Sequence, residues 1–240
     1  MQTERKNIQT DVKSTQLAPH IRPADIERTS MQIIEQELTD LGIVLSAETA
    51  PVVMRAIHTT ADFDYAQNLV FTPDAVQRGI EALRRGTTVV TDTNMALAGV
   101  SKPGLAKLSS EAVCYMADPE VAQEAKQRGV TRAVISAARA AQAHPGCIYA
   151  VGNAPTALFE IARQMELGFR PALVVGAPVG FVHVAEAKEQ IWECCRRLGI
   201  PAIIARGRKG GSSVAAAILN ALIYSATDQL DPENRTWQKL

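Results

Sequence analysis

Residues 147–167 read CIYAVGNAPTALFEIARQMEL, and this stretch decides the fold because it contains one complete strand–loop–helix unit. The apolar run at its start is unbroken, which is typical of a strand buried on both faces of a parallel sheet. Gly152 marks the end of that strand, and Pro155 suits the first turn of a helix. Gly168 follows the helical pattern and favours its end. The stretch therefore predicts a buried strand and then a helix over 155–167.

The same alternation recurs on both sides of this unit. Short apolar runs predict strands at 87–91, 112–115, 147–151, 172–175 and 202–205. Helical patterns cover 23–41, 50–57, 73–85, 119–128, 131–143, 155–167, 184–198 and 212–226. Strands that alternate with helices predict a single-domain α/β fold, with a mainly parallel sheet flanked by helices on both faces. The last helix is apolar all round over 214–223, which indicates burial in the core or in an interface.

Composition sets the size and the boundaries of this domain. Of the 240 residues, 47% are hydrophobic and 5% are aromatic, so the core must be built from Ala, Val, Ile and Leu. This length suits one large domain. We expect a loosely attached leader over residues 1–20, the α/β domain over 21–226, and a polar, frayed tail over 227–240.

Charge and hydropathy argue against several kinds of partner. Lysine plus arginine total 25, as do aspartate plus glutamate, so no net charge draws the chain to nucleic acid or to an anionic membrane. We expect a cytoplasmic protein, because no apolar run approaches the length of a membrane span and the N-terminus has no signal-peptide pattern. The cysteines form no C-x-x-C pair and are expected to be reduced; they are Cys114, Cys147, Cys194 and Cys195.

Four loops that follow strands carry polar or glycine-rich sequence, at 91–95, 152–156, 176–182 and 206–213. In parallel sheets ligands bind beyond the carboxyl ends of the strands, so we expect these loops on one rim. In two of them, polar side chains either form turns or donate hydrogen bonds to a ligand. These candidate ligand contacts are Thr91, Thr93, Asn94, Asn153 and Thr156.

The loop at 206–213 gives the clearest physical signal. Arg206, Arg208 and Lys209 stand among glycines, just before a helix that begins near Ser212. Glycines such as Gly210 let the backbone approach a ligand, and a helix N-terminus offers unpaired N–H groups, so the combination suits an anion. The alternative is a flexible loop whose charges are solvated. The spacing is not that of a Walker A loop, and no G-x-G-x-x-G follows the first strand.

His58 is the candidate for proton transfer. It falls at the end of the helix predicted over 50–57, where a histidine often serves only as a partner of the helix dipole. The alternative is an acid/base role, since imidazole titrates near neutral pH. Asp62, Asp64 and Tyr65 are close enough in sequence to orient it. No ligand spacing indicates a metal site, and no G-x-S-x-G motif indicates a hydrolase.

Six stretches in order together resemble the precorrin-8X methylmutase family. They are PADIERTS at 23–30, RAIHTTADFDY at 55–65, TDTNM at 91–95, GNAPTAL at 152–158, PVGFV at 178–182 and GRKGGS at 207–212. The resemblance implies an isomerase of corrin biosynthesis that moves a methyl group from C-11 to C-12. Its substrate is precorrin-8X, which gives hydrogenobyrinate, or cobalt-precorrin-8, which gives cobyrinate.

The resemblance also implies roles for individual residues. The family histidine matches His58, whose implied role is to exchange a proton with the macrocycle. Ser30 matches a serine that is expected in the pocket, and Arg132 looks like the family's arginine upstream of the GNAPT motif. No cofactor and no metal are expected, and the chain is expected to form a homodimer with active sites close to the subunit interface.

The residues fit such a substrate, which is a large flat ring with several carboxylates. The basic side chains of the 206–213 loop and the amides at Ser212 suit carboxylates. Apolar side chains on the same rim suit the ring; they are Met95, Val179, Phe181 and Val182. Two other hypotheses remain: a non-catalytic carrier of a corrinoid intermediate, and a nucleotide-dependent α/β enzyme that binds phosphate at the glycine-rich loop.

Overall fold

The computed structural model describes residues 22–235, and within them a six-stranded sheet runs in the order β1-β6-β5-β4-β2-β3. Its strands are β1 (Leu69–Phe71), β2 (Val89–Thr91), β3 (Ala112–Val113), β4 (Ile148–Val151), β5 (Leu173–Gly176) and β6 (Ala202–Ala205). Neighbouring strands are parallel, except that β1 pairs antiparallel with β6. The mainly parallel α/β fold is confirmed. The leader over 1–20, with His20, lies outside the described residues.

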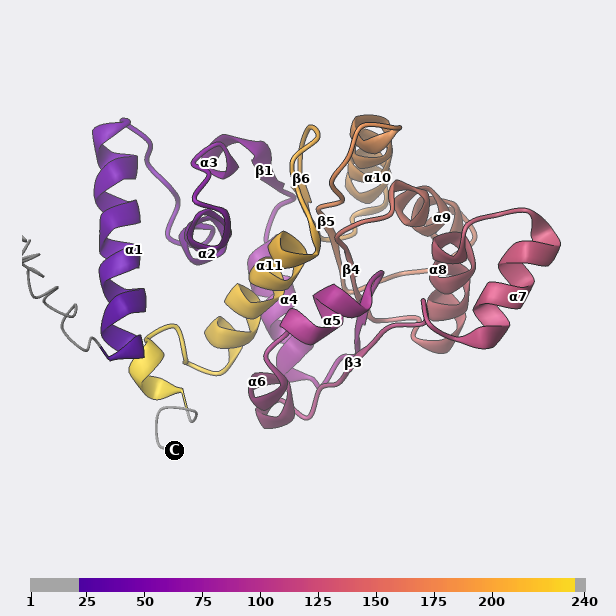
Figure 1. The fold of residues 1–240 in the computed structure, drawn as a ribbon, viewed down its shortest axis with the longest axis horizontal. Coiled ribbons are helices and arrows are strands. Elements are labelled where there is room, and N and C mark those ends of the chain that lie inside the picture. Colours follow the sequence, from indigo (N-terminus) through magenta and orange to yellow (C-terminus); the bar gives the residue numbers. More distant parts are fainter. Residues whose placement is uncertain (1–21, 236–240) are drawn as a thin grey trace, which may run out of the picture.

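The helices form a layer on each face of the sheet (Figure 1). Alternate residues of a strand point to opposite faces, so Ile148 and Ala150 of β4 join one core while Tyr149 and Val151 join the other. The first core lies under α1 (Pro23–Asp40), α2 (Ala50–Thr60), α4 (Ala75–Arg84) and α11 (Ser212–Ala226). The second lies under α8 (Arg132–Ala143), α9 (Pro155–Glu166) and α10 (Val184–Leu198).

The apolar helix α11 is a core helix. Its residues from Val214 to Leu219 are all buried, and it packs against α2, α4 and α5 (Asn94–Gly99). Burial of this helix, one of the two interpretations of its sequence, is confirmed. Because α11 begins directly after the 206–211 loop, its packing fixes where that loop ends.

Several boundaries differ from the sequence prediction. The helix predicted from residue 73 begins at Ala75, because Asp74 adopts a left-handed conformation with φ of 57°. Helix α2 continues to Thr60, so His58 lies within its last turn rather than after its end. Helix α7 (Pro119–Arg128) is as predicted. Sequence patterns did not predict β1 or three short helices: α3 (Tyr65–Asn68), α5, and α6 (Lys102–Lys107).

The segment after α11 is ordered as far as Arg235, so the prediction of a frayed tail is wrong for these residues. A short 3-10 helix, η1 (Pro232–Asn234), returns the chain to α1, and Gln229, Pro232 and Arg235 are buried. Arg235 is held by Glu27 of α1 at 2.6 Å. A buried ion pair, which composition cannot reveal, therefore fixes a polar stretch.

Two further findings concern the described residues alone. Each of the four cysteines, all within residues 22–235, is free of a disulfide. No helix between residues 22 and 235 combines the length and the apolar character that crossing a bilayer requires.

Candidate active site

The candidate proton-transfer group is a pair of side chains from two helices. The Nδ1 atom of His58, in the last turn of α2, lies 3.0 Å from the hydroxyl oxygen of Ser30 on α1. Within residues 22–235 no protein atom forms a hydrogen bond with His58 Nε2, and the ring is half-buried. Ser30 can donate to Nδ1 or accept from it, so the pair allows either neutral tautomer.

Burial, which disfavours the charged imidazolium, holds the pKa of His58 below its ordinary value of 6.5. Glu27 on α1 acts in the opposite direction, while the nearby guanidinium groups of Arg55 and Arg235 lower the pKa further. The neutral imidazole is therefore the main form at neutral pH.

From the sequence, Asp62, Asp64 and Tyr65 were candidates to orient His58, but in the structure His58 forms its hydrogen bond with Ser30. Asp62 and Asp64 instead bind Lys209, with oxygens 2.6 and 2.5 Å from its Nζ atom. This contact joins the end of α2 to the loop between β6 and α11. Within residues 22–235, no group of three or more His, Cys, Asp or Glu side chains has a metal-binding arrangement.

Three strand-end loops meet at the start of α11, as the rim prediction requires. Thr93 Oγ1 lies 2.8 Å from Ser212 Oγ and also accepts the N–H of Ala96 at the start of α5. Gly152 packs so closely that a Cβ atom there would lie 2.7 Å from the Cα atom of Ser212. The loops after β2, β4 and β6 are thus in direct contact.

Asp92 ties the second of these loops to the first. Its carboxylate accepts the backbone N–H groups of Gly152, Asn153 and Ala154 at 2.8, 2.9 and 2.8 Å. Burial raises the pKa of Asp92, although these donors act in the opposite direction. Asp92 was within a motif recognised from the sequence, but nothing there showed that it shapes the neighbouring loop.

Buried Lys188, on α10, holds the cationic loop. Its side chain is 1% exposed, and Nζ donates to the carbonyl oxygens of Gly207 at 2.9 Å and Lys209 at 2.8 Å. Burial lowers its pKa to about 8. Gly210 packs against the carbonyl of Ala177 too closely for any Cβ atom. Lys188 and Gly210 thus hold the backbone of this loop, while the side chains of Arg206, Arg208 and Lys209 are exposed, so anion binding and solvated charges both stay open as interpretations.

The cations of this loop have different surroundings. Arg206 pairs with Glu189 at 3.1 Å and lies over the ring of Trp192, whereas Arg208 lies over Phe181. Phe181 is 82% exposed, and the other apolar side chains expected on the rim are exposed with it; they are Met95, Val179 and Val182. Cationic and apolar groups therefore stand side by side on this surface.

The remaining candidate residues are distributed along the rim. Thr91 is buried and donates to the carbonyl of Thr93 at 3.1 Å, so its hydroxyl is already engaged. Asn94 and Asn153 are exposed. Thr156 bonds Thr131 at 2.9 Å, and neighbouring Arg132 donates to the carbonyl of Met116 at 3.3 Å. Their role as ligand contacts stays a prediction.

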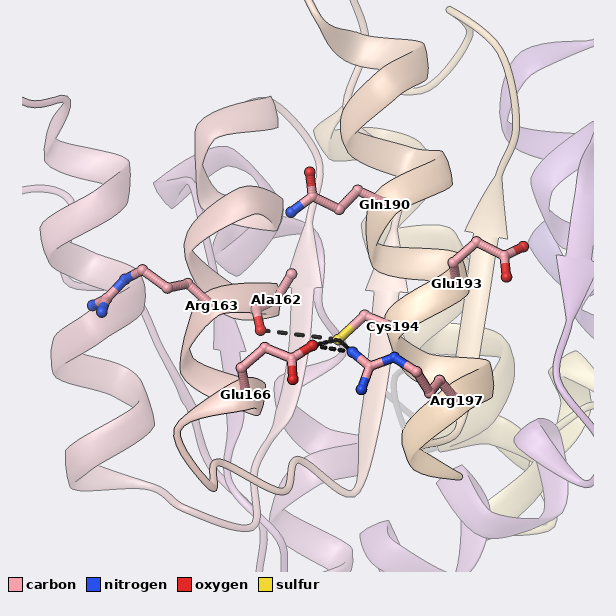
Figure 2. Close-up of a pocket in the computed structure, with 7 residues that line it drawn as sticks. All are labelled: Ala162, Arg163, Glu166, Gln190, Glu193, Cys194 and Arg197. Atoms are coloured by element: carbon pink, nitrogen blue, oxygen red, sulfur yellow. Dashed lines mark hydrogen bonds and ion pairs between the residues drawn. The ribbon is translucent and has the colours of Figure 1, made fainter.

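A surface cavity of about 450 Å³ lies elsewhere, between α9 and α10 (Figure 2). Cys194, Glu166 and Arg197 contact one another there, and none of the candidate residues lines it. The cavity is over the face of the sheet opposite to α2, so it is separate from His58. The candidate site is an open rim rather than this groove.

Comparison with known proteins gives the family. The family model described as precorrin-8X methylmutase matches residues 25–225. The chain belongs to the precorrin-8X methylmutase family. The resemblance noted from the six sequence stretches is confirmed, and the chain is an isomerase of corrin biosynthesis.

Individual members of the family agree with this assignment. The cobalt-precorrin-8 methylmutase of Priestia megaterium is 42% identical over 203 residues, which cover 84% of this chain and 88% of that protein. The precorrin-8X methylmutase of Pseudomonas aeruginosa is 35% identical and covers 82% and 93%. The crystal structure of the Thermus thermophilus precorrin-8X methylmutase has a TM-score of 0.76 at 38% identity, covering 85% and 98%.

Within this member of the precorrin-8X methylmutase family, replacing Lys188 with methionine is expected to raise KM by about tenfold, roughly the worth of one net hydrogen bond. Methionine keeps most of the length of the unbranched side chain but removes both hydrogen bonds to the cationic loop. Steady-state kinetics on the corrinoid substrate measure the change, with exposed Lys126→Met as the matched control. An unchanged KM would show that the hydrogen bonds of Lys188 do not hold the loop in the conformation that binds the substrate.

Proposed function

We propose that the chain moves a methyl group from C-11 to C-12 of precorrin-8X or cobalt-precorrin-8, giving hydrogenobyrinate or cobyrinate, with His58 as the acid/base. The observation that carries this proposal is the 3.0 Å contact between His58 Nδ1 and Ser30 Oγ, which leaves Nε2 to face a ligand. Members named for each of these substrates resemble the chain, so both are candidates.

The pair of His58 and Ser30 suits proton exchange. When the proton of the neutral ring is on Nδ1, Ser30 accepts a hydrogen bond from that N–H, and Nε2 can take a proton from the macrocycle to give the imidazolium. The imidazolium then returns a proton from Nε2, while its Nδ1–H still donates to Ser30. The serine therefore supports both halves of a proton exchange, and the methyl shift itself needs a held ring rather than a redox step.

The rim supplies groups for a ring that carries carboxylates. Arg208 provides positive charge, and Arg206 and Lys209 can exchange their present carboxylate partners for those of the substrate. The amides between Gly210 and Ser212 lie at the N-terminus of α11. Exposed Phe181 and Met95 offer apolar contact for the ring. We assign the polar contacts around the ring to the other predicted residues, Ser30, Thr93, Asn94, Arg132, Asn153 and Thr156, whereas buried Thr91 shapes its loop through the Thr93 carbonyl. A corrinoid partner and a homodimer follow from the same resemblance.

The decisive experiment offers the purified chain precorrin-8X and cobalt-precorrin-8 separately and follows the absorption spectrum. Formation of the corrin chromophore from either one is the expected result. Failure with both would contradict the assignment. Binding without conversion would favour the corrinoid carrier instead, and tight calorimetric binding of a nucleotide would favour the nucleotide-dependent enzyme.

A further inference from the structure

A buried ion-pair cluster lies one helical turn from the pair of His58 and Ser30. Glu27 precedes Ser30 by three residues on α1, and Arg55 precedes His58 by three on α2, so each pair shares a helix face. Arg55 donates to Glu27 at 2.6 Å. The two helices are therefore joined by successive contacts, one between Ser30 and His58 and one between Glu27 and Arg55.

Arg235 completes this cluster from the far end of the chain. Its guanidinium holds both oxygens of Glu27, at 2.6 and 2.9 Å, and the side chain is 5% exposed. Its Nε and Nη2 groups also donate to the carbonyl oxygens of Gln229 at 3.1 Å and Leu230 at 3.2 Å. The forked geometry suits an arginine and not a lysine.

Tyr224 of α11 packs against both guanidinium groups. The Cζ atom of Arg235 lies 4.0 Å from the centre of the Tyr224 ring, and that of Arg55 lies 4.9 Å from it. An aromatic face favours cations, so the ring stabilises two like charges close together. Arg235 lies ten residues after the end of the stretch that matches the family model, which covers residues 25–225.

We infer that Arg235 is a positioning residue for His58: by closing the cluster of Glu27, Arg55 and Arg235 it fixes α1 against α2 and sets the electrostatic surroundings of the imidazole. The inference rests on the proposed acid/base role of His58 and adds a residue that does not touch the substrate. Arg235 is buried behind Glu27, so its influence on the reaction passes through the two helices.

The charges that face His58 come from each element packed against α2. Glu27 of α1 favours the imidazolium, and Arg55 and Arg235 disfavour it. Asp62 and Asp64, on the loop after α2, are paired with Lys209. Helices α11 and α3 bring the phenol side chains of Tyr224 and Tyr65. Removing the Arg235 cation therefore leaves more of the negative charge of Glu27 uncompensated. This charge stabilises the imidazolium, so the pKa of His58 should rise.

The test is an NMR titration of the His58 ring in the full chain without substrate. Arg235→Gln is expected to raise the pKa of His58, and Glu27→Gln is expected to lower it. Arg28→Gln is the matched control, because Arg28 ties α1 to the same C-terminal segment through Asp231 at 3.2 Å but is not among the charges that act on His58. This control is expected to leave the titration unchanged.

Kinetics separate positioning from general structural support. Arg235→Gln is expected to lower kcat by about tenfold while KM stays within about twofold, since a loss of 1.4 kcal/mol at the transition state is tenfold in rate. Arg235→Lys keeps the charge, so the His58 titration should return to that of the unmodified chain while kcat recovers only in part.

A His58 pKa that is equal in the unmodified chain and in Arg235→Gln would overturn the inference. If Arg235→Gln does not fold, the comparison of Glu27→Gln with the double variant Glu27→Gln/Arg235→Gln replaces it, because neither leaves a buried carboxylate unpaired. The double variant should then show the higher His58 pKa, and equality would again overturn the inference. The titration needs no turnover, so its outcome is independent of whether His58 is the catalytic acid/base.

Discussion

His58→Ala is expected to lower kcat by about 10²–10⁴-fold, the usual contribution of a positioned general acid/base. The side chain is half-buried and bonds Ser30, so its removal leaves the fold in place while deleting the group that exchanges the proton. Binding of the corrinoid should be nearly unchanged, because the predicted carboxylate contacts lie in the cationic loop. Steady-state kinetics and a spectroscopic binding titration measure the two quantities separately.

His144 provides the matched control for this variant. It also stands at the C-terminal end of a helix, α8, and its Nε2 atom bonds a hydroxyl group, that of Tyr115, at 2.7 Å. His144→Ala should therefore retain the rate of the unmodified chain. In the unmodified chain, the ionisation of His58 should appear in the pH profile of kcat/KM below 6.5, because burial lowers its pKa in the free enzyme, and it should vanish in His58→Ala. Turnover by His58→Ala at the unmodified rate would refute the acid/base role.

Asp92→Ala is expected to lower the free energy of unfolding by about 3–5 kcal/mol, as breaking a buried charged network does. The Asp92 side chain is 1% exposed, and it accepts the N–H groups of Gly152, Asn153 and Ala154. Alanine would leave these donors without partners in a region that water reaches poorly. The same loop packs on the start of α11, so activity should fall together with stability.

Urea unfolding measures this effect, and Asp118→Ala is the control. Asp118 also follows a strand, β3, and precedes a helix, but as the N-cap of α7 its side chain accepts no hydrogen bond from that helix. Its loss should change the free energy of unfolding by less than about 0.5 kcal/mol, as for ordinary surface positions. If Asp92→Ala were as stable as Asp118→Ala, the carboxylate would not be what holds the loop.

Sequence patterns predicted the parts of the fold that depend on local periodicity and on helix-end residues. The five parallel strands and the start of α11 at Ser212 follow from apolar runs, prolines and glycines. Strand β1 was missed because three residues before Pro73 are too few to show a period. The short helices α5 and α6 begin at side-chain caps, Thr93 and Ser101, within stretches that read as loop.

The candidate site was predictable only in its list of residues. His58 and Ser30 were named by their motifs, but their hydrogen bond joins residues 28 positions apart, and only tertiary packing brings them together. Lys188 falls among the apolar positions of α10, beside Ala187 and Ile191. A lysine at such a position was the one sequence feature that could have indicated a buried, functional side chain. Arg235 had none, since an arginine in a polar segment looks like any solvated charge.

The antiparallel pairing of β1 with β6 has a consequence for how the rim opens. Without β1, strand β6 would be an exposed sheet edge; with it, every residue from Ile203 to Ala205 has a neighbouring strand residue on that side. The amide hydrogens of β6 can then exchange with solvent only when β1 detaches or when the whole sheet unfolds. The cationic loop thus follows a strand that is paired on both sides and opens only after β1 detaches or the whole sheet unfolds, so its geometry persists through smaller local fluctuations.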